Sequence, residues 1–103
     1  MDLEELKNRL RKYKREDIII KYHAKLQAFV RGIDLEEVKD NILNPVRLVY
    51  TEKQKSKFPN EEKYNCYFAY SKNHYHRYVI IINRKIIIAT VIDINRDWQK
   101  AIG

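Results

Sequence analysis

The sequence is poor in residues that interrupt regular structure and in residues that form cross-links. It contains two glycines, two prolines and one cysteine among 103 residues. With 45% hydrophobic and 34% charged residues, this composition excludes a disordered or linker-dominated chain. A lone cysteine excludes an internal disulfide and a thiolate metal cluster within one chain. Cys66 lies in an alternating apolar run, where we expect a small core residue rather than a catalytic thiol.

The chain also lacks a long apolar segment. No run approaches the roughly 18 residues of a membrane-spanning helix, and residues 1–17 contain no apolar stretch of the kind found in secretory signals. We therefore expect no membrane partner and a cytoplasmic location. The length corresponds to a single domain over residues 1–103, since a second core would leave each half undersized.

The positive charge is concentrated in the middle of the chain. Residues 1–44 hold ten Lys/Arg and nine Asp/Glu, residues 45–88 hold nine and three, and residues 89–103 hold two of each. A balanced half joined to a basic, tyrosine-rich half favours one surface that meets a polyanion, with RNA as the expected partner. The alternative is that the lysines protect exposed strand edges and the tyrosines simply favour strands.

Phosphates would be neutralised by basic side chains, and tyrosines would offer faces on which unpaired bases stack. The predicted nucleic-acid-binding residues are Lys53, Lys55, Lys57, Lys63, Lys72, His74, His76, Arg84, Lys85 and Tyr67.

The first half of the chain has helical periodicity. Asp2 is a plausible N-cap for an N-terminal helix within residues 1–16, whose apolar side chains recur at helical spacing. Residues 18–20 are three isoleucines of strand character, and they lead into a second helix that Gly32 should end. A third helix begins at Asp34 and stops at Asn44-Pro45.

The second half alternates apolar and polar residues, which predicts strands over 46–51, 64–70, 75–82 and 85–93. Residues 51–63 form a polar, lysine-bearing loop. A short terminal helix over 95–103 would fold Trp98 and Ile102 back onto the sheet. The predicted fold class is α+β, with N-terminal helices packed on a four-stranded antiparallel sheet.

The register of the last hairpin affects the chemistry. If Asn83 and Arg84 are the two central turn residues, Arg77 stands directly opposite Thr90 and shares a face with it. Alternation turns His74 and His76 to the other face.

His74 and His76 project to the same side of a strand, so both could bind a divalent metal. A structural zinc would need two further ligands, and the nearest candidates are His23, Glu61 and Glu62. Basic neighbours would repel a cation. We expect solvated histidines that add titratable groups to a basic rim, with no metal and no cofactor.

His23 lies between the isoleucine run and the start of the second helix. A helix N-terminus could orient the ring and lower its pKa, which would suit a general acid or base near neutral pH. The alternative is a buried histidine bonded to the backbone.

Residues 17–94 resemble a small family of uncharacterised domains. The resemblance rests on "HAKLQAFVRGIDLEEVKDNILNP" and on a strand meander ending in "IIIATVID". These segments contain the family's His-Ala pair, Arg-Gly-Ile turn, Glu-Glu-Val helix and Thr-Val strand. Such domains often carry an arginine a few residues after His-Ala, where this chain has Lys25, Leu26 and Gln27. Residues 1–16 lie outside the match.

The family is grouped by fold with the RelE/ParE-type toxins and the barnase and colicin nucleases. The resemblance therefore implies a RelE-like fold and a metal-independent ribonuclease in which the RNA 2′-hydroxyl attacks its own phosphodiester. His23 would be the base or acid, Arg77 a bidentate phosphate clamp, and Thr90 a hydroxyl that donates to a phosphate oxygen. Arg77 as an edge charge and Thr90 as an ordinary strand residue are the alternatives.

The sequence leaves open whether the protein is an enzyme at all. A non-catalytic nucleic-acid-binding module and a protein-interaction module of the same fold are alternatives. A toxin of this kind would be held inactive by a cognate antitoxin or inhibitor protein. Neither the RNA sequence preference nor the oligomeric state follows from the sequence.

Overall fold

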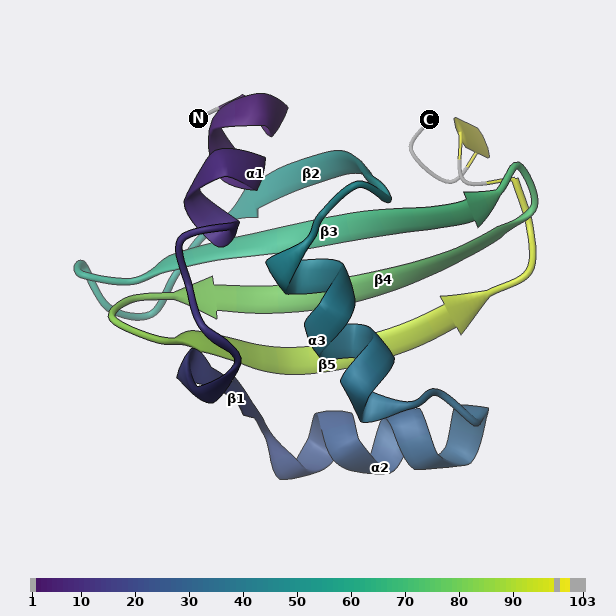
Figure 1. Cartoon of the computed structure of the whole chain (residues 1–103), viewed down its shortest axis with the longest axis horizontal. Helices are drawn as coiled ribbons and strands as arrows, with labels where there is room; N and C mark the ends of the chain where they lie inside the picture. Colours follow the sequence, from purple (N-terminus) through teal and green to yellow (C-terminus); the bar gives the residue numbers. More distant parts are fainter. Residues whose placement is uncertain (1, 98, 101–103) are drawn as a thin grey trace.

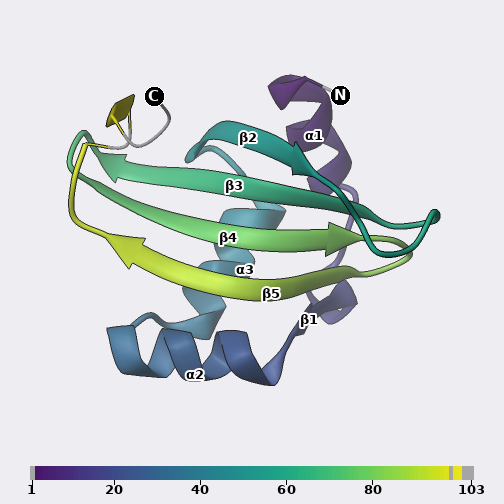
Figure 2. The ribbon, with the colours of Figure 1, turned by 180° about the vertical axis from the view of Figure 1, so that it is seen from behind.

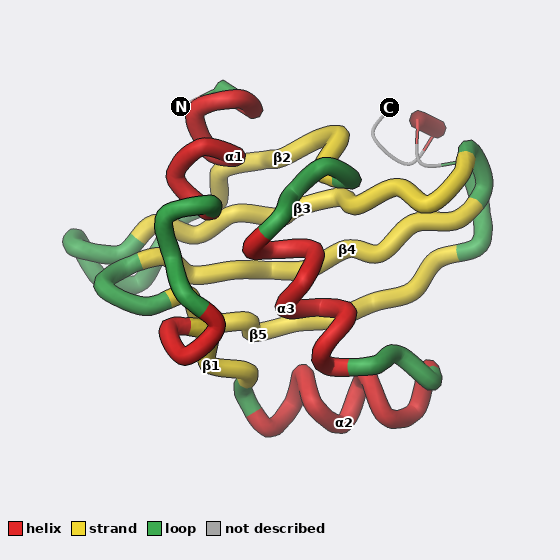
Figure 3. Tube along the Cα trace, viewed as in Figure 1, coloured by secondary structure: helices red, strands yellow, loops and turns green. Residues whose placement is uncertain are grey.

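The computed structural model describes residues 2–97, 99 and 100, and these form three α-helices and five strands (Figures 1 and 3). In chain order the elements are α1 (Leu3–Leu10), a 3₁₀ turn η1 (Arg15–Asp17), β1 (Ile18–Ile20), α2 (Tyr22–Arg31), α3 (Leu35–Leu43), β2 (Leu48–Gln54), β3 (Glu62–Ser71), β4 (His74–Ile82) and β5 (Ile86–Ile94).

The strands form one mixed sheet in the order β1-β5-β4-β3-β2. The α+β class is confirmed, but the predicted four-stranded antiparallel sheet is wrong. Residues 18–20 form a fifth strand that pairs in parallel with residues 86–88. Between β1 and β5 the chain passes through α2, α3 and the β2–β4 meander and returns beside β1 in the same direction. Ile18 and Ile20 are buried in this pairing.

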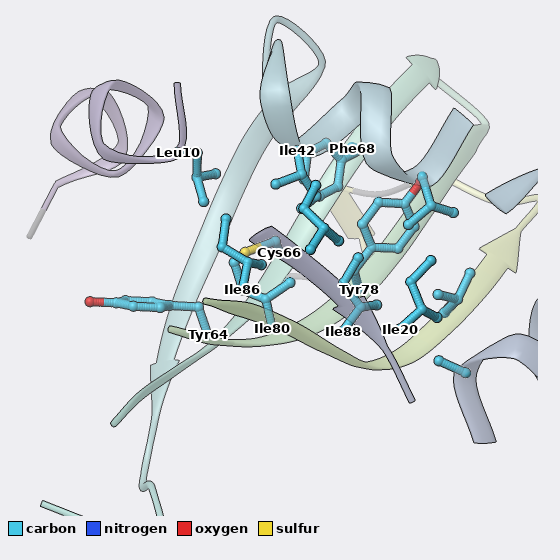
Figure 4. Close-up of a cluster of buried hydrophobic side chains, with 14 of the residues drawn as sticks. Leu10, Ile20, Ile42, Tyr64, Cys66, Phe68, Tyr78, Ile80, Ile86 and Ile88 are labelled. Atoms are coloured by element: carbon cyan, nitrogen blue, oxygen red, sulfur yellow. The ribbon is translucent and has the colours of Figure 1, made fainter. Parts of the chain in front are cut away.

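The helices cover one face of the sheet and leave the other face open. In Figure 1 α3 crosses the sheet in front of β3, β4 and β5, while Figure 2 shows the opposite face with no helix over it. The core lies under α1 and α3, where Leu10 and Ile42 meet inward-facing strand residues such as Phe68 and Ile80 (Figure 4). Cys66 is part of this core, and burial raises the pKa of its thiol to about 12. The thiol is therefore protonated and inaccessible at neutral pH, as expected of a core residue.

The helix ends follow local rules. Asp2 caps α1 by accepting a bond of 2.8 Å from the backbone N–H of Glu5. Gly32 ends α2 with φ at 68°, a conformation that favours glycine. The N-terminal helix is shorter than the predicted range of residues 1–16, and α1 ends at Leu10. The chain then turns toward the sheet, where the Tyr13 hydroxyl donates to the carbonyl of Asn83.

The predicted terminal helix over 95–103 falls mainly outside the described residues. Residues 95–97 are not helical, and Trp98 and Ile102 belong to positions that the structure does not describe. None of the helices in the described part of the chain has the length and apolarity needed to cross a membrane.

The register of β4 against β5 differs from the prediction. Arg77 pairs with Ile92, and Thr90 pairs with Val79. The turn holds three residues, so that Ile82 pairs with Ile86, and a bulge at residue 89 adds a second shift of one. The two shifts add up to two residues, and a shift of two leaves each side chain on the same face of the sheet. Arg77 and Thr90 therefore share the open face, although they are not opposite each other.

Helix α2 protects the edge of β5 that lies beyond the short strand β1. The Lys21 N–H bonds the carbonyl of Ile88, and the Val91 N–H donates to the side-chain oxygen of Gln27 at 2.9 Å. Ala24 and Ala28 are buried on the same helix, so small side chains let α2 approach the sheet. A side chain of α2 thus replaces a ladder bond that a neighbouring strand would otherwise supply.

Gln27→Ala should lower the free energy of unfolding by about 1 kcal/mol, because the Val91 N–H loses its acceptor in a part-buried position. Urea denaturation followed by circular dichroism measures the change. Lys25→Ala, at an exposed position of the same helix, should stay close to wild type. Equal stability of the two variants would show that the side chain of Gln27 does not support the β5 edge.

Candidate functional site

A groove with a basic rim lies at one end of the open face, beside the loop 55–61. Figure 2 shows the backbone of this loop, between β2 and β3, at that end of the sheet. The groove encloses about 730 Å³. Its floor is apolar, because the open-face side chains of Ile81 and Ile87 pair across β4 and β5. The residues that line this basic groove are Lys21, Lys55, Ser56, Lys57, Phe58, Glu61, Lys63, Ile81, Ile87 and Ala89.

The groove combines four lysines and one carboxylate with an exposed aromatic ring. Phe58 is 55% exposed in the loop, so one ring face is available for stacking. Lysines above an apolar floor suit a ligand that carries both negative charge and a flat apolar group. Lys21 belongs to this set, although it precedes the basic middle segment and was not predicted.

The structure separates the predicted nucleic-acid-binding residues into groups. Lys55, Lys57 and Lys63 line the basic groove. Arg84 and Lys85 lie in the adjacent β4–β5 turn, where Lys85 forms an ion pair with Asp17 at 2.9 Å.

The remaining predicted contacts do not join this surface. Lys53 pairs with Tyr64 and so shares the helix-covered side of the sheet. Lys72 lies in the β3–β4 turn at the other end of the sheet. Tyr67 is on the open face but is only 4% exposed, since its ring stacks against Tyr75 at 5.4 Å. Its face is therefore not available to a base, contrary to the prediction.

His74 and His76 are not part of a basic rim. Alternation places both on the face opposite Arg77, as predicted. That face is the helix-covered one, and His76 is only 3% exposed there, so the prediction of a solvated side chain is wrong for His76. The histidines therefore belong to a different environment from the lysines of the groove.

The three residues that the resemblance implicates in catalysis lie on neighbouring elements. His23 is exposed in the first turn of α2, so the buried alternative is wrong. It lies one helical turn before Gln27, which contacts the β5 edge, and this spacing directs His23 to the same edge. Thr90 lies on the open face of β5, and Arg77 lies one strand further from α2.

Arg77 lies among buried polar atoms on the open face. Its Nε, the amide oxygen of Asn65 and the hydroxyl of Tyr75 are buried and have no hydrogen-bond partner among the described residues. All three residues alternate to the same side of β3 and β4. Buried polar atoms are usually hydrogen-bonded, so three unpaired ones on one part of a face are unusual.

A second polar site lies on the helix-covered side, between α3 and the far end of the sheet. We call its hydrogen-bonded part the polar chain, and its members are Glu37, Tyr70, Asn41, Tyr78 and His76. The amide nitrogen of Asn41 donates to both tyrosine hydroxyls, at 2.8 Å to Tyr70 and 2.9 Å to Tyr78. Tyr70 donates to a carboxylate oxygen of Glu37 at 2.9 Å.

The bonding capacity of each group assigns the protons of the polar chain. Because Asn41 donates to Tyr78, the Tyr78 hydroxyl hydrogen goes to Nδ1 of His76, 2.8 Å away. Neutral His76 then carries its own proton on Nε2, which faces Asp93. Burial raises the pKa of Tyr70 to about 12 and lowers the pKa of His76, so the hydroxyl of Tyr70 stays protonated and the ring of His76 stays neutral at neutral pH.

Asp93 completes a group with both histidines, which we call the His–Asp cluster (His74, His76 and Asp93). Nε2 of His74 lies 2.7 Å from a carboxylate oxygen of Asp93, and Nε2 of His76 lies 4.0 Å from the same oxygen. One possible ligand atom from each residue lies within 4.8 Å of the other two. The guanidinium carbon of Arg47 lies 4.2 Å from the centre of the Tyr70 ring, which places a cation near the cluster.

Sequence reasoning missed Asp93, Asn41, Tyr70 and Tyr78. For Asp93 a signal existed, because the alternation of β5 puts it opposite His76 once the register is known. Asn41 looks like a polar position within an amphipathic helix, and only the packing of α3 on the sheet brings it to the tyrosines.

Comparisons with models of protein families, with curated proteins and with solved structures returned no match. The family resemblance therefore stays a prediction, and the function is argued from the geometry of the chain.

Asn41→Ala should lower the free energy of unfolding by about 2 kcal/mol, because the buried hydroxyl of Tyr78 and the part-buried hydroxyl of Tyr70 both lose a donor. Urea denaturation measures the loss. Asn8→Ala, the same change at an exposed helical position, should stay within about 0.5 kcal/mol of wild type. A cycle with Tyr78→Phe should give a coupling of at least about 0.5 kcal/mol, and strict additivity would contradict the polar chain.

Proposed function

We propose that the protein binds single-stranded RNA along the open face of the sheet and cleaves it without a metal ion. The basic groove is the observation that carries this proposal. Its four lysines outnumber the one carboxylate and attract phosphates, and Phe58 offers a stacking surface for a base. The proposed setting is the cytoplasm.

Arg77 continues the open face beyond the groove. It is half-buried and lies four residues from Ile81 along the same face of β4, which corresponds to about 13 Å. Its guanidinium would pair with a phosphate of an RNA strand that extends past the groove. An RNA strand of a few nucleotides is long enough to occupy both places.

The proposed reaction uses groups that border this path. His23 or a neighbouring base takes the proton of the 2′-hydroxyl, and that oxygen attacks the adjacent phosphorus. The bond from phosphorus to the 5′-oxygen breaks, the protonated base returns the proton to the leaving oxygen directly or through water, and a 2′,3′-cyclic phosphate remains. Arg77 stabilises charge on the phosphorane, and Thr90 donates to a phosphate oxygen.

Loss of two groove lysines should weaken RNA binding and its salt dependence. For Lys57→Ala with Lys63→Ala, we expect the slope of log affinity against log salt to fall by about 1.4, at roughly 0.7 per phosphate contact. Fluorescence anisotropy with a short single-stranded RNA in EDTA measures this. Lys12→Ala with Lys14→Ala removes the same charge from exposed positions between α1 and η1 and should leave the slope unchanged.

The same mixtures decide the catalytic part. Wild type should release products ending in a cyclic phosphate, whereas Arg77→Ala should give only background while keeping its far-ultraviolet dichroism. If the RNA stays intact while the groove lysines still change the slope of log affinity against log salt, the protein binds RNA without cleaving it. If the two double-lysine variants bind the RNA with equal affinity, the groove is not the RNA-binding surface.

A protein partner is a second candidate, because α2 presents an apolar stripe to solvent. Tyr22, Leu26, Phe29 and Val30 recur at helical spacing and are 74%, 45%, 85% and 78% exposed. The helix carries His23, Lys25 and Arg31 beside the stripe and no acidic residue. This charge fits an acidic, amphipathic protein segment, which is the role an antitoxin or inhibitor would fill.

Replacing Leu26 and Phe29 by glutamate should change the free energy of unfolding by less than about 0.5 kcal/mol, since both side chains are exposed. An acidic protein that co-purifies with the wild type should, once isolated, rebind the wild type and not this variant in calorimetric titration. Glutamate at the two exposed positions Lys12 and Lys14 is the control and should leave rebinding intact. If the isolated protein binds both variants equally, the stripe is not its docking surface.

A further inference from the structure

We propose that the His–Asp cluster is a binding site for one divalent transition-metal ion, with zinc as the best fit. The ligands are Nε2 of His74, Nε2 of His76 and a carboxylate oxygen of Asp93. Two imidazoles and one carboxylate favour zinc and its neighbours over magnesium or calcium, which prefer oxygen ligands. Three protein ligands leave a fourth position for water or an anion.

Two of the three separations between the ligand atoms lie within about 0.7 Å of those in a tetrahedral site, and the third is no more than 4.8 Å. Metal–ligand bonds of about 2.0–2.2 Å place tetrahedral ligand atoms about 3.4 Å apart. The atoms of His74 and Asp93 are 2.7 Å apart and those of His76 and Asp93 are 4.0 Å apart. The first separation must open by about 0.7 Å and the second must close by about 0.6 Å to reach that value.

Burial determines which side chains make this adjustment. The side chain of His76 is 4% exposed and fixed by Tyr78, whereas those of His74 and Asp93 are 39% and 25% exposed. His74 is the first residue of β4, directly after the turn, so its ring can rotate without disturbing the core. The buried histidine serves as the anchor, and the two partly exposed residues close on the ion.

The polar chain supplies the outer shell that such a site needs. A metal on Nε2 of His76 moves the ring proton to Nδ1, which then donates to the Tyr78 oxygen. Asn41 holds that tyrosine in place, and Tyr70 packs on both histidine rings. Because the Tyr78 hydroxyl hydrogen loses its acceptor in this rearrangement, we expect a dissociation constant on the order of micromolar rather than nanomolar.

The charges around the cluster allow a cation. Glu37 and Asp93 are the carboxylates that act on His76, and Arg47 opposes them from its position over Tyr70. The site is on the helix-covered side and the basic groove is on the open face, so this inference does not depend on RNA binding.

Zinc titrated into the untagged, EDTA-treated full chain should give one site per chain by calorimetry. His74→Ala and Asp93→Asn each remove one partly exposed ligand, and each should weaken binding by at least the 10–100-fold that loss of an outer-shell partner typically costs. His23→Ala is the matched control, since it removes the one other histidine of the chain and should bind as wild type does. Cobalt should give the intense visible absorption of a four-coordinate ion in wild type and His23→Ala only.

Several outcomes would overturn the proposal. One is that His74→Ala and Asp93→Asn both bind zinc as tightly as wild type. Another is that His23→Ala loses as much zinc affinity as they do. A third is that cobalt bound to the wild type gives the weak visible spectrum of a six-coordinate ion. The circular dichroism of each variant, compared with that of wild type, separates loss of the site from loss of the fold. RNA binding by the groove is measured in EDTA, so failure of either proposal leaves the other to be judged on its own result.

Discussion

Alternation along β4 is the constraint on which the two candidate sites depend. Successive side chains of this strand point to opposite faces, so Tyr75 and Arg77 lie on the open face while His74, His76 and Tyr78 point toward α3. The strand lies inside the sheet, paired on both sides, and cannot slip by one residue without exposing its buried isoleucines. A short run of polar residues therefore serves two surfaces of different chemistry.

The two surfaces differ because the helices cover only one of them. Under α3, each polar group of the polar chain is paired with another. On the open face, polar atoms beside Arg77 remain unpaired, and lysines surround an apolar groove. The first arrangement stabilises a fixed geometry suited to an ion, and the second suits a ligand that carries both negative charge and a flat apolar group.

Much of the fold was predictable because it follows from local signals. The caps at Asp2 and Asp34, the glycine that ends α2 and the alternation of β3 to β5 are all visible within a few residues. The placement of β1 was not, since three isoleucines carry strand propensity but no information on their partner. The hairpin register also failed, because the uninterrupted isoleucine run of 86–88 does not reveal a bulge at residue 89.

The sequence by itself determined the α+β class, the basic middle segment and the opposite orientation of Arg77 and the histidines, since each depends on composition or on a period of two. Only the tertiary structure decided which of these residues meet. Asn41, Tyr70 and Asp93 come from α3, β3 and β5, and the packing of a helix on a twisted sheet brings them to His76. The lysines of the groove converge for the same reason: loop 55–61 and the residue after β1 lie at one end of the sheet. Contacts between residues that are distant in sequence depend on strand order and register, which no local pattern specifies.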